Sequence, residues 1–331
     1  MTKSIRWGIL GCGKIARKFA ADLKWVRQAE LAFVAARDKN TAKAFAGETA
    51  AAQSGSYEEL VLHPDVDVIY IATPHGLHYE HAKLCLEHGK SVLCEKAFTI
   101  NYRQANELVE LARTRRLFLM EAFWTKFLPH YRKATELLPN LGSIRYLYAE
   151  FGFKPSPPVA PRIYDPALGG GSLLDIGVYP VFLALDVLGK PDSIEAEMTP
   201  ASTGVDEQCA IRFRYRNGAI AQLFSSFSTN LATGADIAGT NGRLRLTHRF
   251  HGPTARLEYY HNNVDSLQKI ETEVARGFGY EYEAQHVTDC LLQGLTESPV
   301  RPLHDTLLMM ETLDEIREKV GLKYPADSPK K

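Results

Sequence analysis

Lys96 is the residue in this chain best suited to move a proton. It ends the run Leu93-Cys94-Glu95-Lys96, which begins as an apolar, strand-like segment. An amine that is partly withdrawn from water and close to another positive charge loses its proton more readily, so Lys96 is a candidate general acid or base. Taken alone, the pattern is equally typical of a salt bridge to Glu95 or of a solvated loop lysine.

An aspartate and a tyrosine follow a run of glycines in the second half of the chain. Asp175 and Tyr179 come after Gly169-Gly170-Gly171 and are four residues apart, so they share one face of a predicted helix, 172–188. An acid and a phenol on one face can orient a hydroxyl group and relay its proton. The alternative is that Asp175 interacts with the helix dipole while Tyr179 packs against its neighbours.

A glycine-rich turn near the start of the chain predicts a nucleotide site. Gly11, Cys12, Gly13, Lys14 and Ile15 lie between an apolar strand-like run and a helical pattern, and Ala16 completes a GxGxxA motif. In this motif the glycines allow a tight turn and close approach of a pyrophosphate, which binds at the helix N-terminus. We therefore expect these five residues to bind a dinucleotide.

The end of the next strand bears on the choice of nucleotide. A carboxylate there favours NAD, whereas a cation favours the 2′-phosphate of NADP. The sequence Ala35-Ala36-Arg37-Asp38 places a cation first, and guanidinium is a planar, bidentate partner for phosphate. We expect NADP with Arg37 as its ligand, while Asp38 leaves NAD open.

Three histidines follow the strand-like segment 66–72. The i, i+3, i+6 spacing of His75, His78 and His81 does not keep all three on one narrow face, so we predict no metal site. Ligands of an open α/β sheet bind beyond the carboxyl ends of its strands. The residues expected there as cofactor contacts are Thr73, His75, His78, Glu95, Lys96 and Trp124.

The elements that carry these residues alternate in type. The fold expected for residues 1–122 is an α/β Rossmann domain with a parallel sheet. Residues 123–331 are expected to form an α+β domain with an open, largely antiparallel sheet, because strand-like stretches joined by Asn217-Gly218 and Asn241-Gly242 precede two helical patterns. The segments that predict the first sheet and its helices are 5–10, 15–25, 31–36, 41–50, 66–72, 77–88, 91–94, 102–115 and 117–120.

Composition narrows the classes of function. The chain has 331 residues, with 39 basic and 39 acidic side chains, so it lacks the net positive charge of nucleic-acid or membrane-surface binding proteins. Five widely spaced cysteines form no CxxC pair, and the first residues show no signal-peptide pattern. We expect a cytoplasmic protein whose partner is a small molecule, with no membrane span.

Several of these motifs together resemble the glucose–fructose oxidoreductase/inositol dehydrogenase/MocA family over nearly the whole chain. The segments 93–96, 117–124 and 282–287 are similar to the branch that contains dimeric dihydrodiol dehydrogenases and NADP-dependent D-xylose dehydrogenases. The motifs that carry the resemblance are GxGxxA, Glu95-Lys96, Gly-Gly-Gly with Asp175 and Tyr179, Gly239-Thr240-Asn241-Gly242, and Glu297-Ser298-Pro299.

The resemblance implies hydride transfer with a nicotinamide cofactor, NADP or NAD, to or from a secondary alcohol or ketone of a sugar, polyol or cyclic trans-diol. It makes Lys96 the catalytic lysine beside Asp175 and Tyr179, and it implies a homodimer or homotetramer. A nucleotide-bound regulator or metabolite sensor without chemistry, and an enzyme for another sugar class, are the alternatives. Expected substrate contacts are Lys96, Trp124, Phe153, Arg162, Asp175 and Tyr179.

The sequence departs from the family pattern at two positions. Ala97 replaces the proline of Glu-Lys-Pro, and because a non-proline cis bond is unfavourable we expect this loop to be trans or more mobile. Thr41 stands where the branch carries a second arginine, which predicts a weaker preference for NADP.

Overall fold

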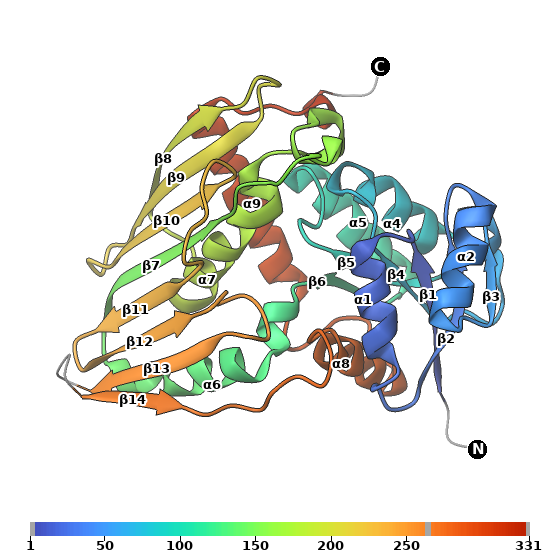
Figure 1. The fold of residues 1–331 in the computed structure, drawn as a ribbon, viewed down its shortest axis with the longest axis horizontal. Coiled ribbons are helices and arrows are strands. Elements are labelled where there is room, and N and C mark those ends of the chain that lie inside the picture. The colour runs from blue at the N-terminus through green and yellow to red at the C-terminus, as the bar shows by residue number, and fades with distance from the viewer. Residues whose placement is uncertain (1–3, 262–265, 329–331) are drawn as a thin grey trace. The chain divides into compact units, whose positions relative to one another are not determined.

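The computed structural model describes residues 4–261 and 266–328, and the chain divides into two compact units. The first unit contains Met1–Phe127 and Ala275–Leu307, and the second contains Leu128–Val274 and Leu308–Lys331. Figure 1 shows one sheet in each unit. The predicted division after residue 122 therefore differs from the observed one, because the chain returns to the first unit after residue 274.

The first unit is built on a six-stranded sheet in the order β3-β2-β1-β4-β5-β6, in which every described pairing is parallel. Its central strands are buried along almost their whole length, as a sheet covered by helices on both faces requires. The strands are β1 (Ile5–Leu10), β2 (Ala29–Ala35), β3 (Gln53–Gly55), β4 (Val68–Ile71), β5 (Ser91–Glu95) and β6 (Leu119–Ala122).

Helices connect these strands and place their carboxyl ends at one edge of the sheet. This arrangement confirms the predicted Rossmann fold. Short 3₁₀ turns follow β4 at His75–Leu77 and β6 at Trp124–Phe127. The helices are α1 (Lys14–Leu23), α2 (Lys39–Thr49), α3 (Tyr57–Leu62), α4 (His78–Glu87) and α5 (Tyr102–Arg115).

The returning segment adds α8 (Glu281–Leu292) to the core of the first unit. Trp7 of β1 donates its indole N–H to the hydroxyl of Thr288 at 3.3 Å. Asp22 at the end of α1 accepts hydrogen bonds from the backbone N–H groups of Phe278 and Tyr280. Residues 275–307 are therefore an integral part of the nucleotide-fold unit.

The second unit is built on an eight-stranded sheet in the order β14-β13-β12-β11-β7-β10-β9-β8. The pair β7–β10 is parallel and the other described pairs are antiparallel, which confirms the largely antiparallel sheet. The strands are β7 (Ile144–Gly152), β8 (Ser193–Pro200), β9 (Asp206–Arg214), β10 (Ile220–Ser226), β11 (Ala235–Gly239), β12 (Gly242–Thr247), β13 (Arg256–His261) and β14 (Leu267–Ile270).

One face of this sheet is covered by helices, as Figure 1 shows. Ile211 and Phe213 of β9 are buried, whereas Arg214 on the opposite face is exposed. This alternation is typical of a sheet with one open side. Helices of the second unit are α6 (Pro129–Leu137), a π-helix over Leu173–Gly177 and α7 (Val178–Leu188), and α9 (Leu303–Val320) begins in the first unit and ends in the second.

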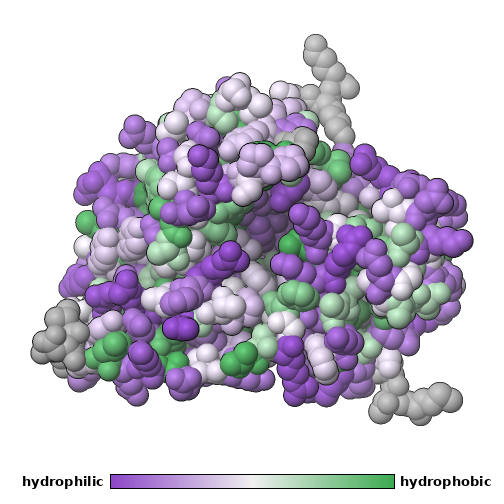
Figure 2. Space-filling model, in the orientation of Figure 1, coloured by the Kyte–Doolittle hydropathy of each residue, from purple (hydrophilic) through white to green (hydrophobic). Residues whose placement is uncertain are grey.

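The helical stretch Pro166–Leu188 is apolar and long enough to cross a membrane by length and composition alone. Of its most apolar window, 72% is buried inside the structure, as in the core helix of a soluble protein, so this is weak evidence for a span. Figure 2 shows that polar residues cover most of the visible face, with apolar residues scattered among them.

Candidate functional site

The glycine turn after β1 forms a cradle that a side chain would fill. Gly11 has a φ of +100°, and a Cβ on it would lie 2.9 Å from Cγ2 of Thr73 and 3.1 Å from the carbonyl oxygen of Ala72. Gly13 precedes the first turn of α1, which contains no acidic side chain and no side-chain cap. The N–H groups of that turn suit an anion, so the residues fit the phosphates of a dinucleotide.

The other residues of the motif border this turn. Cys12 is half-buried, its thiol donates to the carbonyl oxygen of Ala35 at 3.5 Å, and burial raises its pKa to about 11. The side chain of Lys14 is exposed. Ile15 is also 39% exposed, which is high for an apolar side chain and leaves it open to contact with a ligand.

Arg37 and Asp38 follow the end of β2 and differ in what they contact. Asp38 is the N-cap of α2 and accepts hydrogen bonds from the backbone N–H groups of Asn40 and Thr41, at 3.1 and 3.2 Å. These bonds and the Thr41 hydroxyl lower the pKa of Asp38. Arg37 is exposed beside this cap.

Lys96 follows the last residue of β5, next to a carboxylate that ties the loop to the sheet. Glu95 accepts a short hydrogen bond from the hydroxyl of Tyr70 and a 3.3 Å bond from the backbone N–H of Lys96. Burial raises the pKa of Glu95, although both bonds and the charge of Lys96 oppose that rise. The backbone at Lys96 is therefore fixed through Glu95.

The peptide bond between Lys96 and Ala97 is cis, so the expectation of a trans loop is wrong. Ala97 is buried, and its carbonyl oxygen lies 2.8 Å from Nδ1 of His78. Packing and this hydrogen bond hold the loop in the absence of proline.

His78, predicted as a cofactor contact, has both ring nitrogens close to backbone carbonyl oxygens. It is completely buried, and its second ring nitrogen, Nε2, lies 2.7 Å from the carbonyl oxygen of Thr73. The ring thus links the loop after β4 to the loop after β5. Burial lowers the pKa of His78.

The other two histidines contact neighbouring side chains. His75 is buried with its ring centre 5.7 Å from that of His78. His81 is bonded to the hydroxyl of Thr73 at 3.0 Å, and burial lowers its pKa to about 4. Among the described residues, no group of three or more His, Cys, Asp or Glu side chains is arranged to hold a metal ion.

Trp124, after β6, is partly buried and stacks on Tyr280 with ring centres 4.8 Å apart.

Close to Trp124 in sequence, Glu121 forms a 2.6 Å ion pair with Arg301, and both side chains are buried. Glu121 is therefore a structural residue that anchors the returning segment 275–307.

In the second unit, Asp175 lies in a π-helix where an α-helix was expected. Its hydrogen bonds span a wider turn than those of an α-helix, and such turns occur frequently at functional sites. Asp175 is 15% exposed on its side chain, and its Oδ1 lies 3.8 Å from Nη1 of the more exposed Arg162. Asp175 and Arg162, both predicted as substrate contacts, therefore lie close together.

Tyr179, at the start of α7, belongs to an aromatic cluster. The ring centre of Tyr179 lies 5.8 Å from that of Phe151 and 4.4 Å from that of His251. The rings of Phe151 and His251 stack on each other with their centres 4.3 Å apart. Phe153 contacts Phe227 with ring centres 5.2 Å apart. Sequence reasoning missed His251, because the surrounding Arg249-Phe250-His251-Gly252 matches no motif and its partners are distant in sequence.

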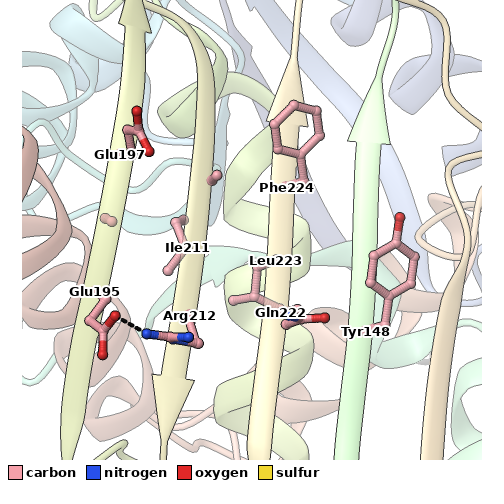
Figure 3. A pocket seen from close by; sticks show the side chains of 10 residues that line it. Tyr148, Glu195, Glu197, Ile211, Arg212, Gln222, Leu223 and Phe224 are labelled. Atoms are coloured by element: carbon pink, nitrogen blue, oxygen red, sulfur yellow. Dashed lines mark hydrogen bonds and ion pairs between the residues drawn. The ribbon is translucent and has the colours of Figure 1, made fainter.

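A separate hollow lies on the open face of the eight-stranded sheet (Figure 3). Its volume is about 560 Å³, and Glu195 and Arg212 form an ion pair on its floor. It contains none of the predicted catalytic residues. Its lining is Tyr148, Glu195, Ala196, Glu197, Ala210, Ile211, Arg212, Gln222, Leu223 and Phe224.

Family models match both parts of the chain. Residues 5–123 match the model described as an oxidoreductase family with an NAD-binding Rossmann fold, and residues 131–245 match the GFO/IDH/MocA C-terminal domain. The chain belongs to the GFO/IDH/MocA oxidoreductase family. This confirms the resemblance found in the motifs, and it makes the protein an NAD(P)-dependent oxidoreductase acting on CH–OH groups.

Relatives within the GFO/IDH/MocA family match over nearly their full length. Trans-1,2-dihydrobenzene-1,2-diol dehydrogenases are 37% identical in Homo sapiens, covering 98% of this chain and 99% of that one, and 38% identical in Xenopus laevis, covering 97% and 99%. A 3-ketoreductase from Actinomadura kijaniata, solved with NADP and TDP-benzene, superposes with a TM-score of 0.85 at 28% identity, covering 96% and 98%. An aldose-aldose oxidoreductase from Caulobacter crescentus shares the fold, with a TM-score of 0.87 at 21% identity over 96% and 98%.

Proposed function

We propose that this protein transfers a hydride between NADP and a secondary alcohol or ketone of a sugar, polyol or cyclic trans-diol, with Lys96 as general acid/base. The observation that carries the proposal is the placement of Lys96. It follows β5 on a loop that Glu95 holds from one side and His78 from the other. The names of the relatives, which act on a cyclic diol and on a 3-keto group, support this class of substrate.

The Rossmann unit binds the nucleotide in this proposal. The phosphates bind at Gly11–Gly13 and the first turn of α1, and Arg37 binds the 2′-phosphate of NADP. When bound, the nicotinamide supplies or accepts the hydride. Asp38 is already the cap of α2, which supports Arg37 as the group that selects the nucleotide.

The chain's own side chains manage the proton. When the alcohol is oxidised, the hydroxyl proton moves to the uncharged amine of Lys96 as the C–H bond gives up its hydride; in reduction, Lys96 returns that proton to the forming alkoxide. Tyr179 assists by hydrogen bonding to the reacting oxygen, and Asp175, held beside Arg162, orients the substrate hydroxyl. Phe153 and Trp124 supply apolar surface for the substrate's carbon skeleton.

The decisive experiment is a reduced-nicotinamide absorbance assay that crosses NADP and NAD with aldoses, polyols and trans-cyclic diols, in both directions. Lys96→Met is expected to lower turnover at least about 100-fold, which is the scale of a lost general acid/base. Lys43→Met, at an exposed position of α2, is the control and retains turnover. Near-normal turnover in Lys96→Met would remove this lysine from its role. Tight nucleotide binding without turnover in the natural protein would favour the sensor.

We also propose that the protein works in the cytoplasm as a homodimer through the open face of the eight-stranded sheet. That face carries charges of both signs, such as the pair Glu195–Arg212 beside Tyr148 (Figure 3) and the pair Asp236–Arg243. A self-complementary patch of this kind suits a two-fold interface. Light scattering at micromolar concentration should give twice the chain mass, and a monomer would contradict the proposal.

A further inference from the structure

A buried carboxylate outside the predicted site holds the start of the helix that carries Asp175. Asp206 is the first residue of β9, and its side chain is completely buried. Its Oδ2 accepts hydrogen bonds from the backbone N–H of Leu173 at 2.6 Å and from the hydroxyl of Ser172 at 2.7 Å. The Ser172 hydroxyl in turn lies 2.9 Å from that of Ser225 in β10. Asp206 therefore ties the π-helix to two strands of the sheet.

The glycines before the π-helix fit closely around this carboxylate. Gly171 has a φ of +111°, and a Cβ on it would lie 2.2 Å from Oδ1 of Asp206, so no side chain fits there. The hydroxyl of Tyr324 donates to the carbonyl oxygen of Gly170 at 2.7 Å. The turn is thus fixed on both sides, and the triple glycine is explained by Asp206 as well as by ligand access.

Asp206 is buried, and among the described residues only one of its two carboxylate oxygens has hydrogen-bond partners. Its Oδ1 is buried and has no hydrogen-bond partner in the part of the chain that the structure describes. Burial is the main reason why its pKa is raised to about 6, while the bonds from Ser172 and Leu173 oppose that rise. A buried, incompletely paired carboxylate is unfavourable for folding, so stability alone does not explain its presence.

We propose that Asp206 is a positioning residue for the reaction: it fixes the first turn of the π-helix, and so the placement of Asp175 and Tyr179, without touching the substrate. The inference rests on the proposed function of those two residues. Leu173 donates its backbone N–H to Asp206 and lies two residues before Asp175. Reacting groups must be held within about 0.5 Å of their productive geometry, and a rigid supporting contact of this kind meets that need.

Two substitutions at Asp206 separate positioning from charge. Asp206→Ala removes the acceptor for Leu173 and is expected to lower kcat by about 10- to 100-fold, on the scale of a misplaced reacting group. Asp206→Asn keeps an oxygen acceptor and is expected to restore most of that loss. The dissociation constant for NADP should stay unchanged in both, because the nucleotide motif lies in the other unit.

Leu244→Ala is the matched control, because Leu244 is completely buried in β12 of the same unit and makes none of these bonds. Leu244→Ala should lower Tm about as much as Asp206→Ala does, but it should leave kcat near that of the natural protein. If Asp206→Ala does not fold, Ser172→Ala, which removes one of the two donors to Asp206, is expected to lower kcat without lowering NADP affinity.

The inference is overturned if folded Asp206→Ala keeps the kcat of Leu244→Ala, or if Asp206→Asn is as impaired as Asp206→Ala. Should Asp206→Ala be unfolded, normal kcat in Ser172→Ala overturns it. These outcomes are distinct from failure of the proposed function, which would appear as no turnover in the natural protein or as full turnover in Lys96→Met.

Discussion

The hydroxyl of Thr41 donates to Oδ2 of Asp38 at 2.9 Å, so the threonine that stands in place of a second arginine is part of the cap of α2. Asp38 is thereby engaged by its own helix, and Arg37 is the exposed side chain beside it. The choice between NADP and NAD is therefore expected to depend on Arg37.

Arg37→Ala is expected to lower kcat/KM for NADP at least about tenfold, because a charge-assisted hydrogen bond contributes about 1.5–3 kcal/mol. The value for NAD should change little, since NAD lacks the 2′-phosphate. Lys43→Ala, an exposed cation on α2, is the control and should alter neither value substantially. Equal losses with both nucleotides would show that Arg37 does not read the 2′-phosphate.

The buried pair of Glu121 and Arg301 gives a test of stability in the first unit. Glu121→Ala leaves the Arg301 guanidinium buried without its carboxylate, and is expected to lower the free energy of unfolding by about 3–5 kcal/mol. Thr306→Val removes one further donor to Glu121 and should have a smaller effect. Urea unfolding measures both, and equal losses in the two variants would contradict this account.

Combining Glu121→Leu with Arg301→Met gives the second arm of that test. No buried charge is then left without a partner. The double variant should therefore lose less free energy of unfolding than the sum of the losses measured for Glu121→Leu alone and Arg301→Met alone. Strict additivity would mean that the two side chains do not depend on each other.

Glu283 on α8 gives a prediction for pH dependence. It is completely buried, and neither carboxylate oxygen has a hydrogen-bond partner among the residues described. Burial, reinforced by the charge of Glu95, raises its pKa well above the ordinary value of 4.5. Above that ordinary value the unfolded chain has lost this proton while the folded chain keeps it, so stability falls as pH rises.

Glu283→Gln removes this titration. Above pH 5, unfolding measurements should therefore show that the variant gains on the natural protein as pH rises, by up to about 1.4 kcal/mol for each pH unit, until the pH reaches the raised pKa of Glu283. Glu87→Gln, at an exposed position of α4, is the control and should show no such trend. A constant difference at all pH values would mean that Glu283 is not protonated in the folded chain.

Local pattern was sufficient for much of the fold. The strand predicted at 5–10 and the helix predicted at 102–115 have the observed bounds of β1 and α5, because the first is a continuous apolar run and the second a helical pattern. The short strand β3 and helix α3 were not predicted, since three and six residues are too few to show a period.

A sequence motif marks Gly11, Lys96 and Asp175, and their roles in the candidate site remain predictions. The site was not predictable where a residue acts through distant partners. Asp206 and Glu283 look like ordinary surface acids in the sequence, and their burial depends on which segments pack over them. The bonds of His78 to Thr73 and Ala97 were not predicted for the same reason, because they appear only in the fold.

The return of residues 275–307 to the first unit has a consequence for synthesis on the ribosome. Trp7 and Phe19 emerge early, yet the core that buries them includes Tyr280, Ala284 and Val287. The nascent chain must therefore keep this apolar surface from aggregating until almost the whole protein has been made. A gene fragment that ends at Phe127 is expected to yield an insoluble or chaperone-bound product, although it encodes the complete six-stranded sheet.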